Sequence, residues 1–334
     1  MTKRSACLLV LALLGALLAG CMLQRSDESP LAAPRSEAEW TALVSELRSF
    51  EGRIGFAPTR NFFAYAPETE AYPHCGHVSR LYLPYSYEDP AIQWRTAATA
   101  EECRALGADS DMSFSLSEAL GERETPVTAS MRSAPLTRFV YLVIHEDCHD
   151  QFELPYGIEE ALCNALTYRA MQQWAAEKFS GKPLQRLAIL RFTREGSKDS
   201  HAARAHYDRL AMLYARHDRA VIAPAVLLQE RARIFGIAER ELAWPKGSMN
   251  NVWLANTMTY ARHHATMERV LEAFGGDVGR TVAFFKEVDA AKPGPDAVVA
   301  RYGIKDRTGL DFLRANEAAV VETIGKRLAA VRGV

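Results

Sequence analysis

The spacing of apolar residues predicts a helix at the start of the folded region, over residues 36–53. Apolar side chains recur there three or four positions apart, at Trp40, Leu43, Val44, Leu47 and Phe50. This spacing places them on one face of a helix. A serine opens the segment and glutamates follow in its first turn, which is typical of a helix start.

The pattern over residues 55–128 is less regular. Residues 55–72 are broken by prolines and rich in aromatic side chains, whereas residues 78–87 (VSRLYLPYSY) combine β-branched and aromatic side chains. The latter composition predicts a strand. Residues 99–106 predict a short helix, and the polar residues 107–128 predict no particular element.

Helical spacing dominates the rest of the chain. A helix is predicted to begin at Pro135 and to carry a nearly continuous apolar run over residues 139–144, and a second one covers residues 158–179. Further helices are predicted over residues 201–216, 220–235, 251–274, 278–288 and 309–327, with Gly236 and Gly275–Gly276 as stops. The whole pattern predicts a predominantly helical α+β fold, with a small α+β front lobe over about 36–180 and a helical rear lobe over about 181–334.

The first 35 residues predict an export signal and a tether. Lys3 and Arg4 precede an apolar stretch over residues 8–19, which is too short to span a bilayer and fits a signal peptide. Residues 18–21 (LAGC) resemble a bacterial lipobox, which implies a signal over residues 1–20, a lipid on Cys21 and a tether over residues 21–35. An ordinary signal peptide is the alternative. Because Met22 rather than Asp follows the cysteine, the resemblance implies the bacterial cell envelope, at the outer membrane and facing the periplasm.

Charge and motif content argue against nucleic-acid binding, nucleotide binding and serine catalysis. The chain has 40 basic and 41 acidic residues, a net charge of −1 and no basic run, so no nucleic acid is expected as a partner. It also lacks a glycine-rich phosphate loop and a G-x-S-x-G elbow, so nucleotide binding and serine chemistry have no support.

Four cysteines remain after the signal and Cys21, namely Cys75, Cys103, Cys148 and Cys163. An oxidising compartment allows disulfides between them, and three pairings are possible. A bridge from Cys75 to Cys103 would link two parts of the front lobe, whereas Cys148 and Cys163 are expected to be buried thiols. Residues 74–77 (HCGH) could bind a metal, but a surface loop with one disulfide cysteine is the favoured interpretation.

The strongest motif is His145-Glu146-Asp147-Cys148-His149, which has the form H-E-x-x-H. On a helix, His145 and His149 lie one turn apart on the same face, so both imidazoles can bind one zinc ion, and Glu146 can act on a zinc-bound water. A catalytic zinc ion takes a third protein ligand. Glu153, Glu159 and Glu160 are the candidates, and of the adjacent pair one is expected to bind the metal while the other caps the helix.

These residues resemble the gluzincins, the zincin-like metallopeptidases whose third ligand is a glutamate on a second helix. The resemblance implies Glu160 as that ligand and Asn164, one turn later, as a brace for a ligand histidine. It also implies an oxyanion donor from the rear lobe, for which Tyr260 is the candidate, with His263 or His264 behind it. Asp147 and Asp150 depart from the family pattern. They could hydrogen-bond the ligand imidazoles, a role for which Asp150 is the candidate, or they could indicate a site changed away from peptide hydrolysis.

The motif helices and residues 250–255 (NNVWLA), 259–260 (TY) and 275–277 (GGD) are also similar to exported bacterial lipoproteins assigned as aminopeptidases. The resemblance implies a membrane-anchored zinc-dependent peptidase, with aminopeptidase activity as the narrower expectation and a peptide as the substrate. Two alternatives remain. One is an inactive zincin-like envelope lipoprotein with a binding or assembly role, and the other is a helical lipoprotein in which His145 and His149 are structural and bind no metal.

Overall fold

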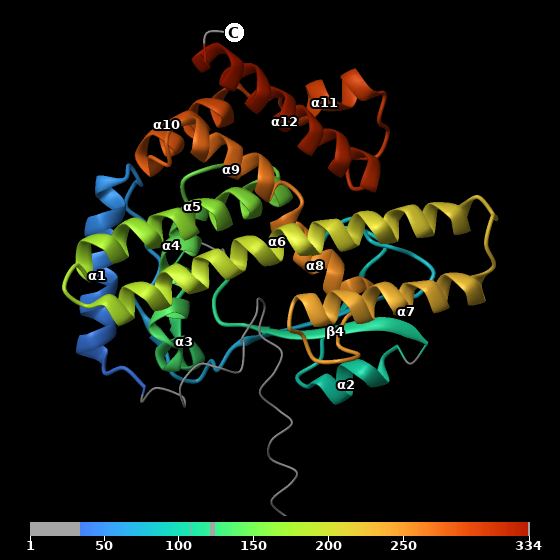
Figure 1. Ribbon diagram of the computed structural model, residues 1–334, viewed down its shortest axis with the longest axis horizontal. Coiled ribbons are helices and arrows are strands. Elements are labelled where there is room, and N and C mark those ends of the chain that lie inside the picture. Colours follow the sequence, from blue (N-terminus) through green and yellow to red (C-terminus); the bar gives the residue numbers. More distant parts are fainter. Residues whose placement is uncertain (1–33, 108, 121–123, 333–334) are drawn as a thin grey trace, which may run out of the picture.

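The computed structural model describes residues 34–107, 109–120 and 124–332 (Figure 1). The predicted signal peptide, Cys21 and nearly all of the predicted tether lie outside these residues. The last residue of the predicted tether, Arg35, contacts the folded region. Its guanidinium donates to the carbonyl of Ala134 and lies over the ring of Phe139. Within the described residues, no helix is both long and apolar enough to cross a membrane.

The chain is predominantly helical, with two small sheets in its first half, as the sequence predicts. The helices are α1 (Glu37–Arg53), α2 (Ala100–Ala105), α3 (Ala129–Ser133), α4 (Leu136–His149), α5 (Tyr156–Lys178), α6 (Pro183–Asp218), α7 (Pro224–Glu241), α8 (Asn251–Ala261), α9 (His264–Ala273), α10 (Val278–Ala291), α11 (Pro295–Tyr302) and α12 (Leu310–Arg332). The strands are β1 (Tyr65–Ala66), β2 (Tyr72–Ser79), β3 (Gln93–Arg95), β4 (Ser110–Ser117) and β5 (Val127–Thr128).

A capping box opens α1. The Ser36 hydroxyl accepts from the backbone N–H of Glu39, and the Glu39 carboxylate accepts from the backbone N–H of Ser36. This reciprocal pair satisfies two backbone donors that a helix start leaves without partners. The buried face of α1 packs into the main core, as its apolar spacing predicts.

The larger sheet is antiparallel, in the order β3-β2-β4. The strand predicted over residues 78–87 is wrong, because β2 lies mostly before it and ends at Ser79. Residues after Ser79 form turns instead. Pro84 has no N–H for a strand ladder, and the buried Asp89 carboxylate accepts from the backbone N–H groups of Tyr85 and Ala91 and so holds a loop together. Strand β4 lies in the region for which the sequence predicted no element.

The main core surrounds α4 and α5, and it combines residues from both sides of residue 180. Eleven of the fourteen residues of α4 are buried, which agrees with the apolar run that predicted this helix. Helices α1, α9, α10 and α12 contribute to the same core. Both helices that carry the candidate ligands are therefore held on several sides, which keeps the spacing of their side chains fixed.

The second half differs from the prediction at several places. Helix α6 begins at Pro183, well before the predicted residue 201, and α11 was not predicted. Gly236 lies within α7 and does not end it, because Phe235, Ala238 and Leu242 continue the buried face against α6 and α8. The single helix predicted over residues 251–274 is divided into α8 and α9. The division falls where Arg262 stacks on Tyr85. The stop predicted at Gly275 and Gly276 is confirmed, since both have positive φ angles.

Figure 1 shows α6 running across the molecule, with α7 beside its second half. A second core, formed by α6, α7 and α8, joins these helices. Arg231 of α7 adds a polar link, because its guanidinium donates two hydrogen bonds to Asp111 of β4. The same carboxylate accepts from the backbone N–H of Asn251 at the start of α8, so one buried aspartate ties the sheet to both helices.

Candidate metal centre

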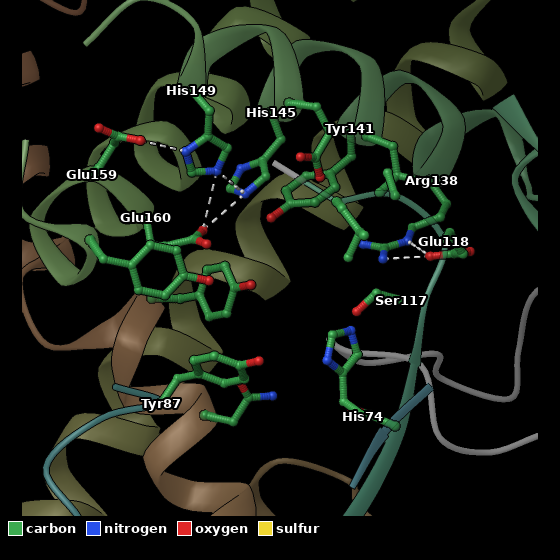
Figure 2. A pocket seen from close by; sticks show the side chains of 18 of the residues that line it. His74, Tyr87, Ser117, Glu118, Arg138, Tyr141, His145, His149, Glu159 and Glu160 are labelled. Carbon is green, nitrogen blue, oxygen red and sulfur yellow. Dashed lines mark hydrogen bonds and ion pairs between the residues drawn. The ribbon is translucent and has the colours of Figure 1, made fainter. Parts of the chain in front are cut away.

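Helix α4 and helix α5 bring His145, His149 and Glu160 together (Figure 2). His145 Nε2 lies 3.1 Å from Glu160 Oε2 and 3.4 Å from His149 Nε2, and His149 Nε2 lies 3.5 Å from Glu160 Oε2. Ligands placed 2.0–2.1 Å from a tetrahedral zinc ion are separated from one another by about 3.4 Å. The three donor atoms therefore have the mutual spacing that one zinc ion requires.

The structure separates the three candidates for the third ligand. Glu160 reaches both histidines, whereas Glu153 is exposed. Glu159 accepts a hydrogen bond from His149 Nδ1 at 2.8 Å and from the backbone N–H of Leu154 at 3.0 Å. A carboxylate on the far nitrogen of a ligand histidine fixes the orientation of the ring and its tautomer. Glu159 lies in the first turn of α5, as the sequence predicted for the acid that is not the third ligand, and it also orients His149.

A disulfide joins the two ligand-bearing helices. Cys148 of α4 is bonded to Cys163 of α5, with 5.5 Å between their Cα atoms, so the prediction of two free buried thiols is wrong. The spacing is within the normal range for a disulfide. Cys75 and Cys103 form the second disulfide, the bridge expected to link two parts of the front lobe. Residues 74–77 lie within strand β2 and not in the surface loop that was expected.

Burial and charge shape the ionisation of the cluster. Burial alone would raise the pKa of Glu160, but the charge of His149 and hydrogen bonds from both histidines hold that pKa well below its usual value. Burial opposes protonation of His149, yet Glu160 and Glu159 raise its pKa well above the usual value. The cluster therefore favours positive charge between the two imidazoles and the carboxylate, which a proton or a metal ion can supply.

Glu146 lies beside the cluster and is buried. Burial raises the pKa of its carboxyl group, and the two histidines only partly oppose this effect. Within the described part of the chain, Glu146 Oε2 has no hydrogen-bond partner. A buried polar atom without a partner is costly, so this oxygen is available for a water or a substrate atom. The donor spacing therefore fits a zinc ion, and Glu146 lies beside the position that the ion would take.

Asn164 acts on the cluster through another residue. Its Oδ1 accepts from the hydroxyl of Tyr141 at 3.2 Å, and the Tyr141 ring stacks on the His145 ring with centroids 5.0 Å apart. The predicted brace is therefore indirect.

Asp147 and Asp150 contact a different part of the chain. Both accept from the side-chain amide of Asn61, at 2.9 and 3.2 Å, and Asp147 also accepts from the Thr59 hydroxyl. The expectation that Asp150 hydrogen-bonds a ligand imidazole is thus corrected. It contacts Asn61 instead, because Asp150 projects from a different face of α4 than the histidines.

The cluster opens on a cavity of about 530 Å³ (Figure 2). Tyr260 lines this cavity, as predicted, and its ring lies 6.1 Å from that of His145. His263 and His264 are not among the lining residues. His263 Nε2 lies 2.7 Å from Glu317 and His264 Nε2 lies 3.3 Å from Glu268.

Several cavity residues were not found from the sequence. Tyr156 is hydrogen-bonded to Glu160, and burial followed by the charge of Glu160 raises its pKa well above the usual value. Tyr156 precedes Glu160 by four positions, so helical spacing could have placed both on one face. Arg138 lines the cavity in an ion pair with Glu118, and Glu88 also lines it. Glu88 comes from a loop distant in sequence, for which no local signal exists.

No family model, curated protein or solved structure matches this chain.

Proposed function

We propose that this protein is a zinc-dependent peptidase. The observation that carries the proposal is the set of three donor atoms of His145, His149 and Glu160 at zinc-like spacing, with Glu146 beside them in a cavity. A bound zinc ion would act as a Lewis acid and lower the pKa of water at the site. Residues of the chain transfer the proton, stabilise the oxyanion and bind the substrate.

Glu146 is the general base in this proposal. Its unpartnered Oε2 takes a proton from the attacking water and passes it to the nitrogen of the leaving amine. Burial raises the pKa of Glu146, which favours a carboxyl group that holds a proton between the two steps. Tyr260 provides a phenol group that can donate to the developing oxyanion. The single phenol proton of Tyr156 is donated to Glu160 instead, and the raised pKa of Tyr156 keeps that proton in place.

The cavity offers features for binding a peptide. Strand β4 pairs with β2 on one side and, within the described residues, with no strand on its other side. Ser115 and Ser117 of β4 line the cavity. An extended peptide can add to such an edge through main-chain hydrogen bonds, which favours a peptide over a compact small molecule as the substrate.

Aminopeptidase activity is the narrower proposal, because it requires an acidic group for the free amine of the substrate. Burial and the charges of Glu317 and Glu160 raise the pKa of Glu88 to about 7. An ammonium group bound there would favour the ionised carboxylate. Glu88 is thus a better candidate than the acids near the motif, since Asp147 contacts Thr59 and Asn61 and Glu159 is hydrogen-bonded to His149.

We also propose export to the cell envelope with a lipid at Cys21. The two disulfides support this part of the proposal, because disulfides persist in oxidising compartments. The alternative of an inactive zincin-like protein depended on Asp147 and Asp150. Their contacts with residues 59–61 leave no observation that favours it.

Metal analysis combined with a peptide-library assay tests the proposal. The wild type should hold about one zinc ion per chain, and His149→Ala should lose it. Glu146→Gln should keep the zinc ion and lose about 100- to 10,000-fold in turnover, since it lacks the base. Libraries with free and acetylated amino termini distinguish an aminopeptidase from an endopeptidase. A wild type that takes up no zinc, or full activity in Glu146→Gln, would contradict the proposal.

A further inference from the structure

A second group of metal-type ligands lies in the sheet, outside the candidate metal centre. Cys75 and His77 are two positions apart on β2, so their side chains share one face of the strand. Cys103 comes from α2, and all three side chains are buried. His77 Nε2 lies 3.3 Å from Cys75 Sγ and 3.7 Å from Cys103 Sγ. His74 lies three positions before His77 on the same strand, so its side chain is on the opposite face. There it lines the cavity of the candidate metal centre.

Hydrogen bonds hold the ring of His77 in place. Its Nδ1 lies 3.1 Å from the Ser110 hydroxyl, which lies 2.8 Å from the carbonyl of Gly107, and the ring is also hydrogen-bonded to the backbone of Cys103. In the tautomer with the proton on Nδ1, the Nε2 lone pair faces the two sulfur atoms, which have no proton to share while they form a disulfide.

We propose that, when this disulfide is reduced, Cys75, Cys103 and His77 bind one Cu(I) ion. A dithiol reductant transfers two electrons and two protons to the sulfur atoms, which gives two thiols, and the dithiol becomes a cyclic disulfide. Binding of Cu(I) then releases the two thiol protons to solvent. The Nε2 lone pair becomes the third ligand, and the bond from Nδ1 to Ser110 holds the ring in the required orientation.

The number and kind of donors favour Cu(I) over zinc. Two thiolates are soft donors that suit Cu(I), and imidazole also binds copper. Among the described residues this group contains three ligands, whereas structural zinc sites almost always have four. The complex would carry one negative charge. Arg95 of β3 is the cross-strand partner of Cys75, and its guanidinium can offset that charge.

Reduction also provides a route for the ion. Helix α2 has only six residues, and its buried Cys103 is the covalent link to the sheet. Once the disulfide is open, α2 is held to the sheet mainly through a small apolar cluster with Ala97, Met112 and Phe114. A helix held by so few contacts can open locally.

A Cu(I) titration of the full chain under anaerobic conditions tests this proposal, with Cys7→Ala and Cys21→Ala in every sample so that no thiol outside the two disulfides is present. The Cys148→Ala/Cys163→Ala variant keeps only the disulfide in question. After reduction with a phosphine and removal of the reductant, it should take one equivalent of Cu(I) from a chromophoric chelator. The oxidised form of the same variant should take none. Adding His77→Ala should weaken Cu(I) binding at least tenfold, and X-ray absorption should show two sulfur ligands and one nitrogen.

Three results would overturn the proposal: equal Cu(I) uptake by the reduced and oxidised forms, unchanged affinity in His77→Ala, or uptake of an additional equivalent of zinc on reduction without uptake of Cu(I). If the double variant does not fold, reduced wild type is compared with Cys75→Ala/Cys103→Ala, which should bind one equivalent less. Each outcome is a difference between reduced and oxidised protein or between two variants, so metal bound at His145, His149 and Glu160 cancels in the comparison.

Discussion

The disulfide between Cys148 and Cys163 should hold the zinc site together. Cys148 directly precedes His149, and Cys163 follows Glu160 by three positions. The bond therefore connects α4 and α5 at the level of the ligands. We predict that Cys148→Ala/Cys163→Ala lowers both the stability of the protein and its affinity for zinc.

The size of both effects can be worked out. The cysteines are 15 residues apart, and closing a loop of that length in the unfolded chain corresponds to about 3 kcal/mol. The other disulfide spans 28 residues, which gives about 3.6 kcal/mol by the same relation. Cys75→Ala/Cys103→Ala is thus a control with a similar stability loss. Only the first pair joins the ligand helices, and losing a group that orients ligands weakens metal binding by about 10- to 100-fold.

Urea unfolding followed by circular dichroism measures the stability, and competition with a fluorescent chelator measures zinc affinity. Both double variants should unfold at lower urea concentration than the wild type. Zinc affinity should fall in Cys148→Ala/Cys163→Ala and remain near the wild-type value in the control. The reasoning is refuted if the two variants lose zinc affinity equally, or if Cys148→Ala/Cys163→Ala binds zinc as tightly as the wild type.

Three further predictions concern the fold. Arg231→Met should lower the free energy of unfolding by up to about 3 kcal/mol, since it removes the guanidinium that is hydrogen-bonded to the buried Asp111 carboxylate and leaves only the more exposed Arg80, 3.9 Å away; a change below about 1 kcal/mol in urea unfolding would contradict this. Hydrogen bonds from His264, Ser197 and His201 outweigh burial and lower the pKa of Glu268 to about 2, so its stabilising effect is present above its unfolded pKa and lost as pH falls towards 2. Glu268→Gln should therefore be less stable than wild type at pH 7, with the difference shrinking below about pH 4 in the same unfolding assay; a constant difference would argue against this role. Gly276→Ala should destabilise more than Gly275→Ala, although both sites have positive φ, because the new Cβ at Gly276 would displace the Arg169 guanidinium from its hydrogen bond to the Gly276 carbonyl; equal melting temperatures would rule out that effect.

Local patterns in the sequence were sufficient for several helices and for the grouping of the candidate ligands. The capping box at Ser36 and the apolar run of α4 depend on residues within one or two turns, and both predicted helices are present. The cluster of His145, His149 and Glu160 needed only helical spacing and a short turn between two helices. Such relations are fixed by helix geometry and are therefore readable from one chain.

Relations between distant elements could not be read in the same way. The loop after Ser79 is held by Asp89 and packs against other elements, so its strand-like composition was misleading. Glu88 reaches the cavity from that loop. The Cys148–Cys163 bond did leave a signal, because each cysteine follows a ligand by three positions. That spacing puts both on the ligand-bearing faces, where the two helices meet.

Helix geometry also explains where the two aspartates at the motif project. At about 100° per residue, Asp147 projects about 200° from His145 and Asp150 about 140°, whereas His149 projects only about 40°. The two aspartates therefore face away from the cluster. Burial raises the pKa of Asp147, while hydrogen bonds with Thr59, Asn61 and Glu51 oppose that shift. Burial and the charge of Asp147 raise the pKa of Glu51 well above its usual value, so a protonated Glu51 can donate to the aspartate. The acids thus anchor the back of α4 to α1 and to residues 59–61.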